Sequence, residues 1–221
     1  MEFFQSIADI FLHLDKNLAA VIAQFGPLTY VFLFLIIFLE TGIVITPFLP
    51  GDSLLFAAGT LSVGGSMNIF FLFVILASAA IIGDSVNYFI GKIVGPRIFE
   101  MRRIPLMKKE NLIKTEKFYE KHGGKTIILA RFIPIIRTFA PFVAGIGKMS
   151  YTKFISYNIF GGLLWVSLFL FSGYFFGALP IIKENFHLAI MGIIFVSLLP
   201  VAVEYIKHLQ DKRKKVELSL D

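Results

Sequence analysis

The sequence contains no cysteine, and only 16% of its 221 residues are charged. Without cysteine the chain has no disulfide, no thiolate metal ligand and no cysteine nucleophile. Soluble domains are on average about 45–50% apolar and about a quarter charged. This chain is instead 57% hydrophobic, with a mean hydropathy of +0.79. The composition therefore excludes a soluble globular protein.

Motifs of hydrolytic and metal enzymes are also missing. The four histidines are scattered, without the i, i+4 spacing of a helical zinc site: His13, His122, His187 and His208. There is no Gly-x-Ser-x-Gly elbow. Gly124-Lys125-Thr126 resembles the end of a phosphate loop, but Tyr119 occupies the required upstream glycine position. We therefore expect no enzymatic activity, no cofactor and no metal.

Long uncharged segments dominate what is present. Residues 53–83, 154–182 and 185–203 contain no Asp, Glu, Lys or Arg. A helix of about 20 apolar residues crosses the hydrocarbon core of a bilayer. The sequence therefore predicts a membrane protein with several crossings.

The net charge of +6 is concentrated in two places. Ten Lys and Arg, against four Glu, lie between Lys92 and Lys125, and the chain ends in a basic tail containing residues 212–215. Such clusters favour cytoplasmic loops and contacts with anionic lipid headgroups, and we expect no nucleic-acid partner. The N-terminus, the linker and the tail are accordingly predicted on the cytoplasmic side of a prokaryotic cytoplasmic membrane.

Two apolar segments carry too many helix-breaking residues for straight spans. We interpret both, about 41–65 and 126–148, as re-entrant hairpins. Their shape is attributed to prolines and glycines in each segment: Pro47, Pro50 and Gly51 in the first, and Pro134, Pro141 and Gly145 in the second.

The two hairpins resemble each other in sequence. Phe48-Leu49-Pro50 corresponds to Phe132-Ile133-Pro134, and Ala58-Gly59 corresponds to Ala144-Gly145. Because a single span separates the hairpins, they must open to opposite faces, as inverted repeats of transporters do. The predicted fold is an all-α membrane protein with two inverted hairpins and about four transmembrane helices. Its predicted parts are an interfacial helix (1–25), one transmembrane domain (26–208), the basic linker (92–125) and a basic tail (209–221).

Five ionisable residues fall inside the apolar segments: Glu40, Asp52, Asp84, Arg131 and Arg137. A lone charge at the centre of a membrane helix costs about 2.5–3.5 kcal/mol on insertion scales. We therefore expect Glu40 and Asp52 of the first repeat to pair with Arg131 and Arg137 of the second. The pairs could simply staple the hairpins together, but a contact within lipid needs no charge, so a functional site is favoured.

Chemistry suggests a division of roles within this set. The protonation of Glu40 and Asp52 would respond to burial and to neighbouring charge, which proton coupling requires. Arg131 and Arg137 offer planar forks that bind phosphate with two hydrogen bonds. Asp84 is equally consistent with helix–helix hydrogen bonding and with a place in the site. Trp165 and the many Phe residues are interpreted as ordinary core or lipid-facing residues, and the Gly-x-x-x-Gly pairs at 91–95 and 173–177 as close helix packing.

Over about residues 30–180 the sequence closely resembles the DedA family, whose members share the VTT (SNARE-associated) domain with eukaryotic lipid scramblases. The resemblance rests on Glu40, Pro50-Gly51-Asp52, Gly83-Asp84-x-x-x-Tyr88-x-x-Gly91, Arg131-Phe132-Ile133-Pro134-x-x-Arg137, Ala144-Gly145-x-Gly147-x-Met149, and Phe154, Asn158, Gly161 and Trp165. The chain departs from the family pattern at Phe48-Leu49, where many members have a second proline directly before Pro-Gly-Asp.

The resemblance implies proton-motive-force-coupled translocation of undecaprenyl phosphate or a phospholipid. It assigns proton coupling to Glu40 and Asp52 and substrate binding to Arg131 and Arg137, with Asp84 and Asn158 as candidate supporting polar residues. The expected partners are a lipid phosphate and protons, and a homo-oligomer stays open. Two alternatives also stay open: a proton-coupled antiporter for an ion or small cation, and a non-transporting membrane assembly factor. The sequence does not name the lipid or the direction of transport.

Overall fold

The computed structural model describes residues 14–43, 51–98, 123–147 and 149–177, with short pieces at 179–180, 182, 188–189 and 191–193. Every regular element in these ranges is helical, which confirms the predicted all-α class for this part of the chain. The elements are α2 (Leu14–Phe25), η1 (Gly26–Leu28), α3 (Thr29–Gly42), α4 (Gly51–Ser62), α5 (Ile69–Ile98), η2 (Gly123–Lys125), α7 (Thr126–Ala130), α8 (Pro134–Ile146) and α9 (Tyr151–Phe176).

Three stretches are long and apolar enough to cross a membrane: Leu18–Gly42, Ile69–Val94 and Tyr151–Phe176. α5 continues to Ile98, past the predicted end of its span at Gly91, so the first residues assigned to the linker are helical. Most of the last uncharged segment, 185–203, lies outside the described residues, as do positions 99–122 of the linker and the tail 209–221.

The first of these stretches bends between α2 and α3. Gly26 has a φ of 52°, which favours glycine, and Pro27 follows it in η1. The bend coincides with the predicted boundary between the N-terminal helix and the transmembrane domain. The interfacial position of the N-terminal helix stays a prediction, and its residues 1–13 lie outside the described part.

Both predicted hairpin segments contain a break. In the second, α7 ends at Ala130, Ile133 is extended, and Pro134 begins α8. Proline suits the first position of a helix because no hydrogen bond is lost there. In the first, α3 ends at Gly42 and α4 begins at Gly51; Pro47 and Pro50 lie outside the described residues. The re-entrant path and the inversion of the two segments stay predictions.

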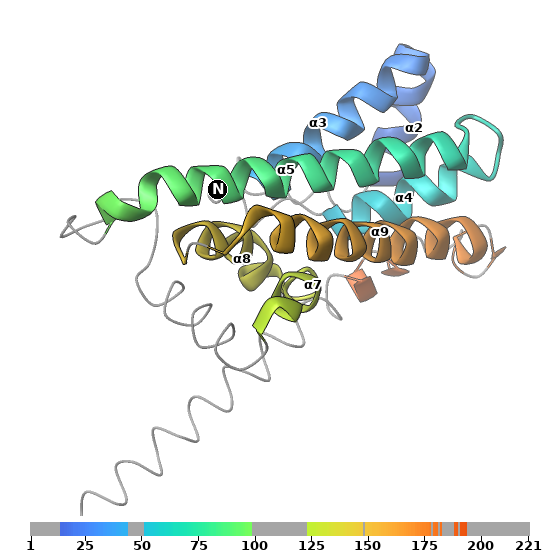
Figure 1. Ribbon diagram of the computed structural model, residues 1–221. Helices are drawn as coiled ribbons and strands as arrows, with labels where there is room; N and C mark the ends of the chain where they lie inside the picture. The colour runs from blue at the N-terminus through green and yellow to red at the C-terminus, as the bar shows by residue number, and fades with distance from the viewer. Residues whose placement is uncertain are drawn as a thin grey trace, which may run out of the picture.

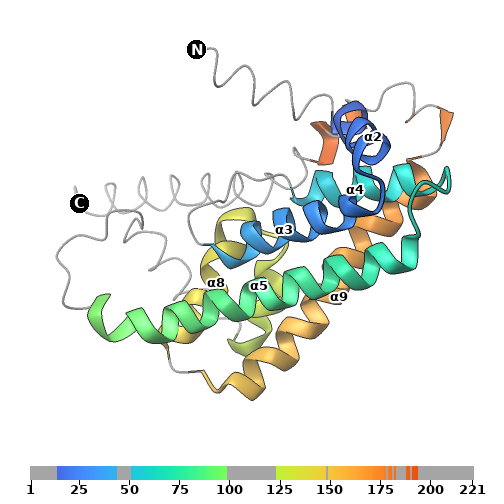
Figure 2. The ribbon, with the colours of Figure 1, turned by 90° about the horizontal axis from the view of Figure 1, so that it is seen from above.

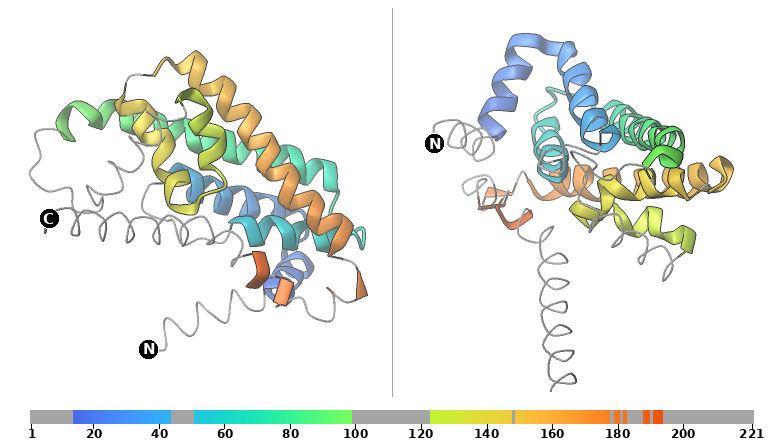
Figure 3. Two further views of the ribbon diagram at one scale, coloured as in Figure 1. Left: turned by 90° about the horizontal axis from the view of Figure 1, so that it is seen from below. Right: turned by 90° about the vertical axis from the view of Figure 1, so that its left-hand side faces the viewer.

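The helices pack in a reciprocal arrangement. α5 and α9 cross each other as the two long helices (Figures 1 and 2). α4 from the first segment lies along α9, the span that follows the second segment (Figure 3), whereas α8 from the second segment packs on α5. We call α3–α5 the first half of the chain and α7–α9 the second half. α4 and α8 therefore each contact the long helix of the other half, and the two breaks are brought toward a common centre.

Glycines make these contacts close. A Cβ on Gly59 would overlap the Leu170 carbonyl of α9, and one on Gly173 would overlap the Phe56 carbonyl of α4. The α5–α8 contact is built in the same way, by Gly91 against Phe142 and Gly145 against Tyr88. The prediction that Gly91 and Gly173 serve helix packing is confirmed, and Gly145 has the same use.

We expect Gly173→Ala to destabilise the protein by about 1–3 kcal/mol, the usual cost of overpacking. Its Cβ would collide with the backbone of α4. Alanine is by itself the better helix former, by about 1 kcal/mol, so a loss of stability would report packing alone. The measurement is the midpoint of unfolding in detergent. Gly64→Ala, whose Cβ would meet nothing closer than 3.9 Å, is the control; equal midpoints for both variants would contradict the packing argument.

Candidate functional site

The ionisable residues of the apolar segments come together from five elements. Glu40 lies near the end of α3 and Asp52 in the first turn of α4, while Asp84 lies within α5. Arg131 follows α7, and Arg137 lies in the first turn of α8. Glu40, Asp84, Arg131 and Arg137 are buried, and the Asp52 side chain is 13% exposed.

Arg137 binds two carboxylates. Its Nη2 is 2.6 Å from Glu40 Oε1, and its Nη1 is 2.7 Å from Asp52 Oδ1. The predicted pairing of Glu40 and Asp52 with an arginine of the second half is confirmed, although a single arginine holds both acids. The ion pairs join α8 to both α3 and α4, so the site bridges the two halves of the chain.

Gly51 makes room for this arrangement. A Cβ at position 51 would overlap the Glu40 carboxylate. Gly51 also begins α4, so Glu40 lies beside the N-terminus of a helix, where negative charge is favoured. This close contact explains why the central residue of Pro-Gly-Asp is a glycine.

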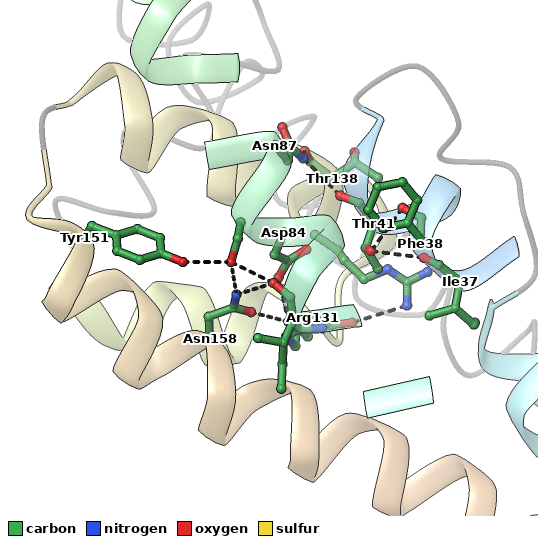
Figure 4. A network of polar contacts seen from close by, with 12 residues as sticks. Ile37, Phe38, Thr41, Asp84, Asn87, Arg131, Thr138, Tyr151 and Asn158 are labelled. Atoms are coloured by element: carbon green, nitrogen blue, oxygen red, sulfur yellow. Dashed lines mark hydrogen bonds and ion pairs between the residues drawn. The ribbon is translucent and has the colours of Figure 1, made fainter. Parts of the chain in front are cut away.

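Arg131 forms a second centre with different partners. Its Nη2 is 2.6 Å from Asp84 Oδ2 and also donates to Asn158 Oδ1 (Figure 4). Asn158 is itself fixed, because its Nδ2 donates to the Ile81 carbonyl at 3.0 Å. The side chain of Arg131 lies over Gly161 and Gly162 of α9, where a Cβ would come within 3.3–3.4 Å of guanidinium atoms.

Asp84 is therefore a direct ion-pair partner of Arg131 and belongs to the charged cluster; its functional role stays a prediction. The expected set of two acids and two arginines sums to zero. The observed set has three carboxylates for two guanidinium groups, so it carries one net negative charge when all five are ionised. Buried charge is costly unless compensated, and a surplus carboxylate is where a proton is most readily held.

Trp165 links the two centres. Its interpretation as a core residue is confirmed, but the sequence did not indicate its contacts with the charged side chains. Trp165 is fully buried, and its Nε1 donates to Asp52 Oδ1 at 2.8 Å. The guanidinium carbons of Arg137 and Arg131 lie 5.0 and 6.0 Å from its ring centroid, within the range of cation–π attraction. One signal was available: the only tryptophan of the chain lies in the middle of a span, whereas interfaces are the usual place.

Asn87 is a further polar link that the sequence did not single out. Its Nδ2 donates to the Thr41 carbonyl of α3 at 3.2 Å and to the Thr138 carbonyl of α8 at 2.8 Å. Pro141 lies inside α8 and lacks the N–H that would bond the Arg137 carbonyl, and Asn87 binds the next carbonyl of the same turn. An amide from α5 thus supports the backbone of both helices that carry Glu40 and Arg137.

Several buried polar atoms of the site have no hydrogen-bond partner among the described residues. Three are guanidinium donors, Nε and Nη1 of Arg131 and Nε of Arg137, and three are acceptors, on Glu40, Asp84 and Asn87. Each buried unsatisfied group costs about 1–3 kcal/mol, so their concentration at one place marks a centre suited to binding. No group of three or more His, Asp or Glu in the described ranges is arranged to hold a metal ion.

We expect Arg137→Met to lower the free energy of unfolding by about 3–5 kcal/mol, because it leaves buried carboxylates without their cation. Adding Glu40→Gln to this variant should recover part of the loss, since a neutral amide is cheaper to bury than a carboxylate. Denaturant unfolding followed by Trp165 fluorescence measures all four members of the cycle. Strictly additive effects of the two substitutions would contradict the pairing.

Comparisons with known proteins cover the part of the chain that holds this site. The VTT domain model matches residues 49–175, which include Asp52, Asp84, both arginines and Trp165. Protein DedA of Escherichia coli K12 is 52% identical over 94% of this chain and 96% of its own length. An uncharacterized membrane protein of Mycobacterium leprae is 42% identical over 84% of both chains.

The inner membrane protein YqjA of Escherichia coli K12 is 33% identical over 69% of both chains. No solved structure matches the chain. None of these printed names states a catalytic activity, and two of them place the relatives in a membrane. The extent of the domain match and the identity over nearly the whole length show that the chain is a membrane protein of the DedA family.

Proposed function

We propose that the protein translocates a phosphate-bearing lipid, undecaprenyl phosphate or a phospholipid, across the cytoplasmic membrane, driven by the proton motive force. The observation that carries the proposal is the buried pair of arginines with partnerless N–H donors beside a surplus carboxylate. Arginine stays charged and binds phosphate through two parallel hydrogen bonds. A proton and a phosphate monoanion together add no net charge to the buried site.

The proposed cycle uses groups on the two halves of the chain. The lipid tail stays in the bilayer while the phosphate enters between the broken segments. Protonation of a carboxylate releases an arginine to the headgroup, and loss of the proton restores the ion pair and expels the phosphate. Exposure of the centre to the two membrane faces in turn would move the headgroup across, with the basic linker and the chain ends on the cytoplasmic side.

The reciprocal packing of α4 on α9 and α8 on α5 supports this proposal physically. Each break is held by the other half, so a shift of one half changes both. Transporters with repeated halves place their sites at such a junction. A purely structural staple would not need several buried donors and acceptors left without partners, since each destabilises the fold.

We expect Arg131→Lys and Arg137→Lys each to slow lipid movement about 10- to 100-fold, which corresponds to losing one hydrogen bond to a charged group. Lysine keeps the charge but not the planar fork. The measurement is flipping of a fluorescently labelled polyprenyl phosphate in proteoliposomes, followed by quenching from outside. Lys153→Arg, a conservative change at an exposed basic residue, should leave the rate unchanged.

The same assay separates the alternatives. A cation antiporter would respond to Na⁺ or K⁺ gradients and keep its activity in the lysine variants. An assembly factor would show no flipping, and its cellular activity would survive Glu40→Gln with Asp52→Asn. Flipping at the parent rate after neutralisation of Glu40, Asp52, Arg131 and Arg137 together would overturn the proposed mechanism.

A further inference from the structure

The two arginines differ in the number of acids that hold them. Arg137 contacts both Glu40 and Asp52, whereas Asp84 is the one carboxylate in ion-pair contact with Arg131 among the described residues. If one acid of the first centre is protonated, Arg137 still has a carboxylate partner. If Asp84 is protonated, Arg131 has none. A single proton can therefore release Arg131 but not Arg137.

Arg131 is also better prepared to bind an anion. Its Nε and Nη1 both lack hydrogen-bond partners within the described residues, and the residue is 1% exposed. Its Nε–H lies on the same guanidinium edge as Nη2, the edge that a phosphate accepts bidentately, and Nη2 is the atom that Asp84 holds. On Asp84, Oδ1 is likewise buried without a partner. The pair is thus bound through one atom on each side, which leaves both groups free to exchange partners.

A line of polar side chains connects this pair with the exposed end of α9 (Figure 4). Tyr151 is 37% exposed and begins α9. Its hydroxyl donates to Ser85 Oγ at 3.4 Å, and Asn158 Nδ2 donates to the same oxygen at 3.5 Å. Asn158 in turn accepts from Arg131. The Ser85 hydroxyl itself donates to the Ile81 carbonyl at 2.8 Å, so the line reaches the ion pair through the Asn158 amide and Arg131 and holds these groups in position.

The charged and titratable groups around Asp84 come from every helix packed on α5. They are Glu40 of α3, Asp52 of α4, Arg131 after α7, Arg137 of α8 and Tyr151 of α9, with Tyr88 on α5 itself. Arg131 is in direct contact with Asp84. Glu40 and Asp52 share Arg137, whereas Arg131 is the cation in ion-pair contact with Asp84. The protonation of Asp84 is therefore coupled directly to Arg131 and to whatever occupies it.

We propose that Asp84 is the acid whose protonation decides whether Arg131 holds a carboxylate or the lipid phosphate. The inference rests on the proposed function and assigns one step of it. A proton forms an O–H bond on Asp84, the ion pair opens, and the Arg131 N–H groups bind the phosphate oxygens. Loss of that proton reverses the exchange. Arg137, with its two acids, stays in place and joins the halves.

The first test is Asp84→Asn, which keeps the shape of the side chain and imitates its protonated form. In proteoliposomes with fluorescently labelled polyprenyl phosphate, we expect flipping to continue but to lose its dependence on a pH gradient. The ratio of rates with and without the gradient should fall to unity. A folded Asp84→Asn protein that keeps the wild-type ratio would overturn the proposal.

The second test concerns the other centre and leaves the Asp84–Arg131 pair intact. Glu40→Gln imitates protonation of one of the two acids on Arg137, which keeps Asp52 as a partner. We expect this variant to keep the dependence of flipping on a pH gradient. A ratio of rates that falls to unity in Glu40→Gln would place the decisive proton at the other centre and overturn the proposal. This test holds even if Asp84→Asn does not fold.

A further readout does not depend on transport. Trp165 is the only tryptophan of the chain, and its ring lies 6.0 Å from the Arg131 guanidinium. Its fluorescence in detergent should change with pH in wild type and lose that change in Asp84→Asn. If wild type does not flip lipid but shows this titration, the proposed function fails while the Asp84 switch stands. If wild type flips lipid and Asp84→Asn keeps both responses, only the present inference fails.

Discussion

The pairing of five ionisable side chains in an apolar interior is the constraint on which this structure depends. Four of these side chains are buried away from water: Glu40, Asp84, Arg131 and Arg137. Each therefore needs a partner of opposite sign within a few ångströms. The partners lie on different helices, and the helices must therefore be interrupted and brought together at one place. The break before Pro134 puts Arg131 and Arg137 on separate elements that converge on Trp165.

The glycines follow from the same constraint. Arginine and carboxylate side chains can meet at ion-pair distance only if the backbones that carry them approach closely. Gly51 leaves space for the Glu40 carboxylate, and Gly161 and Gly162 leave space for Arg131. Gly59 and Gly145 bring the short helices against the long ones. Small residues in membrane proteins commonly serve such packing, and here they also set the geometry of the charged centre.

Much of this could be predicted from the sequence because charges in apolar segments are few and must pair. Composition indicated a helical membrane protein, and Pro134 indicated the break that separates the arginines. The partner of each charge could not be predicted, because pairing depends on which helix faces which. Asp84 sits on a long helix whose sequence gives no orientation, and Trp165 looks like any other large apolar residue. Only the crossing of α5 and α9 places them beside Arg131 and Asp52.

The unequal partnership of the two arginines gives the site a rigid part and an exchangeable part. Arg137 is held by two acids, and its acid Asp52 is held in turn by Trp165. Loss of one contact leaves the others in place, so this centre keeps the halves joined. Arg131 has one acid and a neutral amide, with two donors left over. A protein that binds and releases an anion while its helices stay packed needs both kinds of arginine. Both contact the indole ring of Trp165, which holds the two centres next to each other.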